Sequence, residues 1–185
     1  MLRIPYGKSY LECEIKGAEV LRSGVDGLKP EGSGPDIVRR AMESPIGSPR
    51  LRELARGKNS CVLIISDHTR PVPSRDIIPN MLRELREGSP DIDLTLLVAT
   101  GFHRSTTQEE LRHKLGEELA ENLKIHVHDC RDSAQNVQIG VLPSGAPCVI
   151  NRLAAETQLL IAEGFIEPHL SLIHISEPTR LGMIS

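Results

Sequence analysis

The feature of the sequence that most limits the possible folds is a continuous apolar run, Cys61 to Ile65, followed directly by a polar loop, Ser66 to Pro73. A run of β-branched and aliphatic residues of this length is typical of a strand covered on both faces, as in a parallel sheet. Asp91 to Ala99 and Gln158 to Ala162 repeat the pattern of an apolar segment that ends in a polar loop. Between the first two strands, Ser74 to Glu87 carries apolar residues at helical spacing, which predicts a helix that joins parallel strands.

The rest of the chain divides into shorter elements. The sequence predicts a hairpin of strands at 2–5 and 9–15, a strand at 124–128, and a second hairpin of strands at 137–141 and 147–150. It predicts helices at 36–42, 51–56, 106–115, 117–122 and 151–156. Thr106 and Thr107 can cap the third of these helices, because Glu109 and Glu110 follow them at capping-box spacing. Strands that alternate with helices indicate a layered α/β domain. We expect a mainly parallel, Rossmann-like sheet with helices on both faces.

The composition argues against several classes of protein. The 22 Lys and Arg residues against 25 Asp and Glu give a net charge of −3, without the concentrated positive charge that nucleic-acid binding needs. The longest apolar runs are about five residues, far short of the roughly 20 that cross a membrane. The start of the chain carries no apolar leader, so we expect a cytoplasmic protein with neither nucleic acid nor membrane as a partner. The four cysteines are widely separated and predict reduced, largely buried thiols.

Three polar loops follow the predicted strands, at 66–73, 100–106 and 163–169. In open parallel sheets, ligands bind beyond the carboxyl ends of the strands, where such loops converge. If the three strands are neighbours, one edge of the sheet therefore collects acid–base and anion-binding groups. These are Asp67, His68, Arg70, His103, Arg104 and His169.

Arg70 and the two loop histidines are the strongest candidates for chemistry. Arg70 lies in a loop stiffened by prolines, and a guanidinium binds a carboxylate or phosphate with two parallel hydrogen bonds. The alternative is that Arg70 pairs with Asp67 and only holds the loop. His103 and His169 can take and return a proton near neutral pH, although a single loop histidine is often without function.

Two further patterns are weaker. His126 and His128 alternate on one predicted strand and so face the same side, with Asp129 next to them. This spacing suits a metal-dependent hydrolase, although one such pair is a weak signal. The segment after Thr100-Gly101 lacks the G-x-x-x-x-G-K-[ST] pattern, which argues against a P-loop nucleotidase.

Several segments, in order and at similar spacing over residues 1–169, resemble the N-terminal domain of the nickel-pincer-dependent lactate racemase family. The strings D-H-T-R-P-V-P and G-F-I-E-P-H are the most specific of them. The segments are Tyr6-Gly7-Lys8, Pro45 to Pro49, Ser66 to Pro73, Ala99 to His103, Ile150 to Arg152 and Glu163 to His169.

The resemblance implies an isomerase that racemises or epimerises small 2-hydroxy acids such as lactate by proton-coupled hydride transfer to a nickel-pincer nucleotide. It implies that Asp67, His68, Thr69 and Arg70 contact this cofactor and that Arg70 also steers the substrate carboxylate. His103 and His169 match the two family histidines that stand on opposite faces of the substrate. The resemblance assigns no metal ligand to a residue of this chain.

The sequence departs from the family after His169. There the family continues into a Gly-rich stretch with a lysine that tethers the cofactor, then a nickel-binding histidine and a second domain. Residues 170–185 contain neither a Gly-rich loop nor a lysine, and they read like the in-frame translation of a sequencing-library adaptor, so His174 is not a candidate ligand. We therefore expect an N-terminal domain at 1–169, a non-native tail at 170–185 and an inactive fragment that does not retain the cofactor. The alternative is a non-catalytic module that binds an anion or a mononucleotide.

Overall fold

The computed structural model describes residues 2–17, 19 and 27–164 of the chain, which forms two units, 1–32 and 33–185. The first unit contains an antiparallel hairpin of β1 (Leu2–Tyr6) and β2 (Ser9–Cys13). Gly7 in its turn has a φ of +59°, a backbone conformation that glycine adopts without strain. This confirms the hairpin predicted at the start of the chain. The predicted tail at 170–185 and His169 lie outside the described residues.

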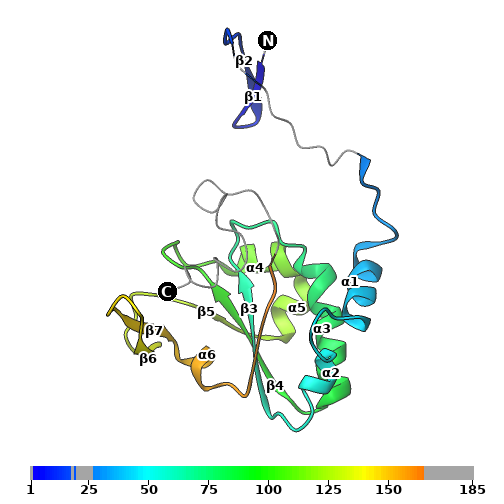
Figure 1. The fold of residues 1–185 in the computed structure, drawn as a ribbon, viewed down its shortest axis with the longest axis vertical. Helices are drawn as coiled ribbons and strands as arrows, with labels where there is room; N and C mark the ends of the chain where they lie inside the picture. Colours follow the sequence, from blue (N-terminus) through cyan, green and yellow to red (C-terminus); the bar gives the residue numbers. More distant parts are fainter. Residues whose placement is uncertain (1, 18, 20–26, 165–185) are drawn as a thin grey trace. The chain divides into compact units, whose positions relative to one another are not determined.

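The second unit is built on a parallel sheet of four strands (Figure 1). The strand order is β5 (Lys124–Val127), β4 (Asp93–Ala99), β3 (Ser60–Ser66) and β8 (Leu159–Ala162). Leu63 at the centre of β3 lies opposite both Leu96 of β4 and Ile161 of β8. The structure thus confirms the predicted α/β class, a parallel sheet flanked by helices.

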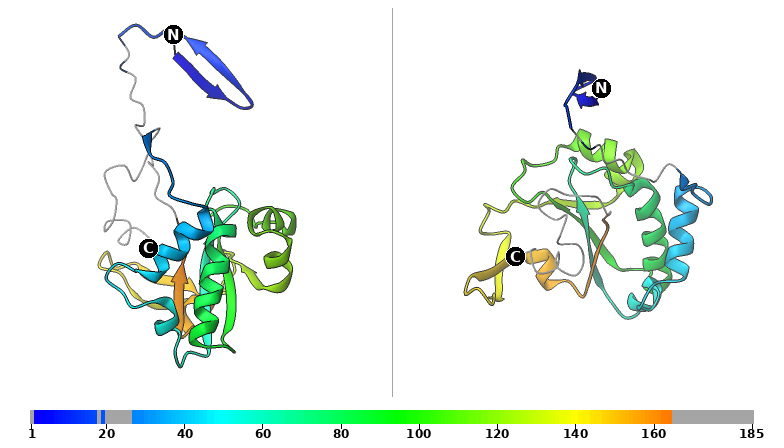
Figure 2. Two further views of the ribbon diagram at one scale, coloured as in Figure 1. Left: turned by 90° about the vertical axis from the view of Figure 1, so that its right-hand side faces the viewer. Right: turned by 45° about the horizontal axis from the view of Figure 1, so that its top comes forward.

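One face of this sheet is covered by three helices that follow β3 and β4 in the chain. They are α3 (Ser74–Gly88), α4 (Gln108–Leu115) and α5 (Glu117–Asn122). Their apolar side chains enclose the main core together with the strands; its buried members are Leu63, Ile65, Ile78, Leu96, Val98, Leu111, Leu115 and Ala120. Figure 2 shows α1 (Gly34–Glu43) lying beside α3, and α2 (Leu51–Leu54) also packs on α3.

Side chains alternate between the two faces of a strand. The other face of the sheet therefore carries Val62, Thr95 and Leu97, which are also buried. A hairpin of β6 (Asn136–Val141) and β7 (Pro147–Asn151) forms as predicted, and α6 (Arg152–Glu156) leads from it into β8. Within the described residues, no helix is both long and apolar enough to cross a membrane.

The prediction of buried thiols is only partly correct. All four cysteines are free, but only Cys61 on β3 is buried, whereas Cys13, Cys130 and Cys148 are partly exposed. Burial raises the pKa of the Cys61 thiol to about 11, so this thiol is unreactive at neutral pH.

Candidate active site

The loops that follow β3 and β4 meet at the carboxyl edge of the sheet. Asp67, the first residue after β3, is 2% exposed, and its Oδ2 lies 2.5 Å from Nδ1 of His103 in the loop after β4. An imidazole that donates its Nδ1 proton to a carboxylate keeps the lone pair of Nε2 for another proton. The structure therefore brings together a buried carboxylate and a partly exposed imidazole in an arrangement that suits a general base.

The carboxylate of Asp67 is also held by its own loop. Its Oδ1 accepts hydrogen bonds from the backbone N–H of Thr69 at 3.0 Å and from the Thr69 hydroxyl at 2.6 Å. Burial raises the pKa of Asp67, but the hydrogen bonds from Thr69 and His103 outweigh this effect and hold the pKa below its usual range. Asp67 is thus an anion at neutral pH that fixes the orientation of His103.

The lowered pKa of Asp67 makes the free energy of unfolding depend on pH in the acidic range. A carboxyl with a lowered pKa in the folded state contributes stability above its unfolded value, here 3.8, and that contribution is lost as the pH falls through the folded value. We expect Asp67→Asn to show a smaller loss of the free energy of unfolding between pH 6 and pH 2.5 than the unsubstituted chain, as measured by urea titration. Asp93→Asn removes an exposed carboxylate and serves as the control. Equal pH dependence in the chain and in Asp67→Asn would contradict this account.

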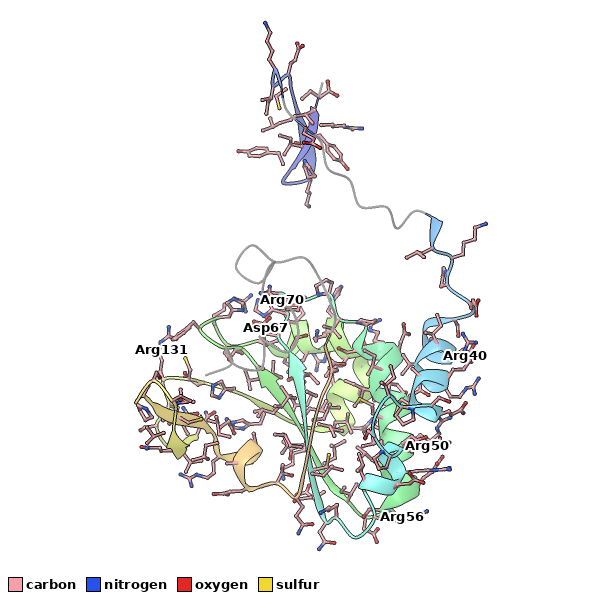
Figure 3. The ribbon with its side chains drawn as sticks, in the orientation of Figure 1. Arg40, Arg50, Arg56, Asp67, Arg70 and Arg131 are labelled. Carbon is pink, nitrogen blue, oxygen red and sulfur yellow. The ribbon has the colours of Figure 1, made fainter. Side chains whose placement is uncertain are left out.

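Thr69 connects His103 to Arg70. Its hydroxyl oxygen lies 3.5 Å from His103 Nδ1 and accepts a hydrogen bond from Arg70 Nη1 at 3.4 Å. Figure 3 shows Asp67 and Arg70 at the same end of the sheet. Because one oxygen lies within 3.5 Å of nitrogens on both side chains, the imidazole and the guanidinium are close enough to contact one small ligand.

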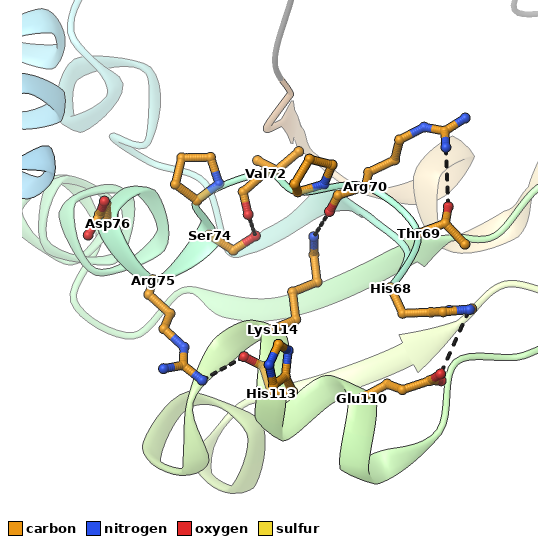
Figure 4. Close-up of a pocket in the computed structure, with 12 residues that line it drawn as sticks. His68, Thr69, Arg70, Val72, Ser74, Arg75, Asp76, Glu110, His113 and Lys114 are labelled. Carbon is orange, nitrogen blue, oxygen red and sulfur yellow. Dashed lines mark hydrogen bonds and ion pairs between the residues drawn. The ribbon is translucent and has the colours of Figure 1, made fainter. Parts of the chain in front are cut away.

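A pocket of about 790 Å³ opens between the loop after β3 and helix α4 (Figure 4). Basic side chains outnumber acidic ones in its lining: His68, Arg70, Arg75, His113 and Lys114 against Asp76 and Glu110. The excess of donors and positive charge suits an anionic ligand such as a carboxylate or a phosphate.

Two of the predicted site residues, His68 and Arg104, contact residues at the start of α4. His68 contacts Thr106 Oγ1 through Nδ1 at 3.3 Å, and its Nε2 lies 3.8 Å from Glu110. Arg104 donates to both oxygens of Glu110, at 2.9 and 2.5 Å. These hydrogen bonds from Arg104, followed by one from the backbone of Thr107, lower the pKa of Glu110 to about 2. The side chains of His68 and Arg104 are thus turned toward α4, and within the described residues no hydrogen bond joins either of them to the side chain of Asp67 or His103.

Helix α4 begins where the sequence predicts a cap. The Thr107 hydroxyl accepts from the Glu110 backbone N–H at 3.3 Å, and a Glu110 carboxylate oxygen accepts from the Thr107 N–H at 2.9 Å. This reciprocal arrangement fixes the first turn of a helix. It therefore fixes the wall of the pocket that α4 supplies.

Three more residues belong to this region that were not among the predicted site residues: Lys114, Ser74 and Glu163. The Lys114 ammonium donates to Ser66 Oγ and to the Arg70 carbonyl, both at 3.1 Å. The Ser74 hydroxyl donates to Glu163 Oε1 at 2.5 Å. The signal for Lys114 was its place beside the apolar face of α4, which directs its stem inward. For Glu163 the signal was its place at the end of a strand of the parallel sheet.

The proposed metal site at His126 and His128 has no support in the described part of the chain. His126 Nε2 lies 2.9 Å from Gln135 Oε1, and His128 Nδ1 lies 3.1 Å from Asn151 Nδ2. Within the described residues, no group of three or more His, Cys, Asp or Glu side chains could hold a metal ion. The two histidines instead connect the sheet to the hairpin of β6 and β7.

Comparison with known proteins identifies relatives of this chain. Lactate racemases from Thermoanaerobacterium thermosaccharolyticum and Lactiplantibacillus plantarum are 50% and 53% identical to the chain over 171 and 169 residues. These matches cover 91% and 90% of the chain but only 40% of each relative. The chain thus spans about 40% of the length of the curated relatives that it matches.

Solved structures include two that are similar to this chain in fold. The lactate racemase apoprotein from T. thermosaccharolyticum matches with a TM-score of 0.80 and 49% identity, over 90% of this chain and 39% of that one. A protein from Thermotoga maritima, with a TM-score of 0.50 and 19% identity over 70% of this chain, shares the fold alone. The family model described as the lactate racemase N-terminal domain matches residues 6–172, and the chain belongs to that family.

Proposed function

We propose that this chain forms the N-terminal part of the active site of a racemase for small 2-hydroxy acids such as lactate. The single observation that supports this most is the cluster of Asp67, Thr69, Arg70 and His103, in which one hydroxyl oxygen lies within 3.5 Å of a candidate base and of a carboxylate-binding guanidinium. A 2-hydroxy acid carries its hydroxyl on the carbon next to its carboxylate. The imidazole of His103 can therefore contact the hydroxyl while the guanidinium of Arg70 contacts the carboxylate.

In this proposal His103 moves the proton of the substrate hydroxyl. Asp67 orients the ring through Nδ1, so Nε2 takes the hydroxyl proton of one enantiomer while the hydrogen on the same carbon would leave as hydride to the bound cofactor, and the carbon becomes planar. In the reverse direction, Nε2 returns the proton to the same oxygen. The negative charge of Asp67 stabilises the imidazolium that forms in between. Arg70 binds the substrate carboxylate and thereby sets which atom of the acid faces His103.

Racemisation needs a second proton-transfer group on the other face of the substrate, because the two enantiomers present their hydroxyls on different sides. The resemblance assigns this role to His169, which lies outside the described residues. Relatives that carry the activity in their names are longer than this chain. We therefore propose that the 185-residue chain alone is inactive and that the remaining part of the protein completes the site.

The family resemblance implies a nickel-pincer nucleotide, which would act as the hydride acceptor and donor when bound. The described residues fit the anionic part of such a group, since the guanidiniums of Arg70 and Arg75 line a pocket large enough for a mononucleotide. Thr69 and Ser74 add hydroxyls to the same lining. We propose that Asp67, His68, Thr69 and Arg70 hold it on this side, and we assign no nickel ligand to this chain.

The activity can be tested on a long form, in which residues 1–169 are joined to the remaining part of the L. plantarum relative. We expect the long form, loaded with cofactor, to interconvert D- and L-lactate, as followed by chiral chromatography, and the 185-residue chain to leave each enantiomer unchanged. Lactate binding without racemisation by the long form would favour the alternative of a non-catalytic anion-binding module. Racemisation by the 185-residue chain would refute the proposal that it is inactive.

Replacing the guanidinium tests the role of Arg70. We expect Arg70→Lys in the long form to raise KM for lactate about 10- to 100-fold, because a point charge replaces a fork that makes two charge-assisted hydrogen bonds. Arg83→Lys on α3, where the guanidinium pairs with exposed Glu87, is the matched control and should leave KM unchanged. An unchanged KM in Arg70→Lys would remove Arg70 from substrate binding.

A further inference from the structure

Lys114 connects helix α4 to the loop that carries Arg70. Its ammonium donates to Ser66 Oγ, at the end of β3, and to the carbonyl oxygen of Arg70, 44 residues away in sequence, both at 3.1 Å. Figure 4 shows the Lys114 side chain reaching across the pocket wall to this carbonyl. The contact is therefore between a charged donor on a rigid helix and the backbone of a functional loop.

The Arg70 backbone is held from both sides. Its N–H donates to the Asp67 carbonyl at 3.3 Å, and its own carbonyl accepts from Lys114. The next residue, Pro71, has no N–H, and its ring limits the rotation of the chain. Lys114 and Asp67 together thus set the point and the direction from which the Arg70 side chain leaves the loop.

The surroundings keep the Lys114 ammonium at this place. Lys114 is partly buried, and the negative charges that act on it are those of Glu163, after β8, and Asp67. Glu163 is fixed by the hydrogen bond from Ser74, while its second oxygen, Oε2, is buried and has no hydrogen-bond partner within the described residues. The Lys114 charge favours the ionised form of this partly buried carboxyl, and that interaction would be lost if the ammonium moved away.

We propose that Lys114 is a positioning residue that fixes the backbone of Arg70, so that the guanidinium is already directed at the substrate carboxylate before the substrate binds. The inference rests on the proposed function only for the role of Arg70. The new element is that Lys114, on helix α4, fixes the Arg70 backbone before the substrate binds. Preorganised groups bind more tightly because less conformational freedom is lost on binding.

The first test uses the 185-residue chain without ligand and measures amide hydrogen exchange by NMR. We expect Lys114→Met, which keeps the stem but removes the donor, to speed exchange at the Thr69 and Arg70 amides about 10-fold or more, as for the loss of a hydrogen bond to a charged group. Lys114→Arg, which restores a charged donor, should return both rates to within about 3-fold of the original. Lys114→Gln is too short to reach the Arg70 carbonyl and should behave like Lys114→Met, which gives a second variant if the first does not fold.

The control is a lysine outside the pocket. Lys124→Met removes an exposed lysine that pairs with Asp93, and it should leave the exchange at Arg70 unchanged. Equal acceleration along the whole of α4 in Lys114→Met would show a general loss of helix stability and would overturn the proposal, as would unchanged exchange at Thr69 and Arg70.

The second test uses the long form and separates this inference from the proposed function. If both are correct, Lys114→Met raises KM for lactate about 10-fold, more than it lowers kcat, and Lys114→Arg restores KM. A long form that does not racemise lactate without any substitution contradicts the proposed function, and the exchange rates of the 185-residue chain then still decide on Lys114. A normal KM in an active Lys114→Met long form overturns the inference alone.

Discussion

In the long form, His103→Ala lowers kcat for lactate racemisation by about 10²- to 10⁴-fold, the range expected when a positioned general base is removed. The structural reason is the pair with Asp67: the buried carboxylate and the Thr69 turn hold one imidazole in one orientation, and alanine leaves no group that can accept the hydroxyl proton there. Both directions of the reaction slow, because His103 accepts the hydroxyl proton when one enantiomer is consumed and donates it when that enantiomer is formed. The measurement is the initial rate from pure D- and from pure L-lactate.

The matched control for this prediction is His126→Gln. It also removes an imidazole, but from β5, where His126 contacts Gln135, away from the pocket. The rate of this variant should remain within about 3-fold of the original, as expected for a residue that takes no part in proton transfer. His103→Ala that retains full activity and a normal fold would exclude His103 as the base and would remove the main support for the proposed mechanism.

Leu63→Ala lowers the free energy of unfolding by about 2 to 5 kcal/mol, the usual cost of a cavity at a fully buried leucine. Leu63 is 0% exposed at the centre of β3 and lies opposite Leu96 and Ile161 in the sheet. A domain of this size is stable by about 5 to 15 kcal/mol, so this one substitution removes a large share of the total. Urea unfolding followed by circular dichroism measures the change.

Leu160→Ala provides the comparison within the same sheet. It removes the same atoms, but Leu160 on β8 is 47% exposed, so we expect a loss of about 1 kcal/mol. Similar losses in the two variants would mean that the core is not centred on β3. A variant of Leu63 that unfolds completely would be consistent with a domain at the lower end of the stability range.

Local patterns in the sequence predicted most of the secondary structure. The apolar run of Cys61 to Ile65 lies within β3, the helical spacing after Ser74 within α3, and the capping pattern at Thr107 starts α4. Each of these signals comes from residues that are close together in the chain, and each type of element has its own period. The prediction of one edge rich in polar loops also depended only on where the strands end.

Side-chain partners could not be predicted in the same way. The sequence left open a pair of Arg70 with Asp67, whereas the Asp67 carboxylate is bound by Thr69 and by His103, which is 36 residues away. The order of the strands, with β8 next to β3, decides which loops meet, and periodicity contains no information about strand order. The role of Lys114 could not be predicted for the same reason, because its partners come from β3 and the following loop.

The position of β8 beside β3 has a kinetic consequence. Their pairing closes a chain loop that holds α3, β4, α4, α5, β5, the hairpin of β6 and β7, and α6. The entropy lost on closing a loop grows with its length, and contacts between residues distant in sequence slow folding. Glu163 directly follows β8, so its hydrogen bond with Ser74 in the pocket lining depends on this distant pairing.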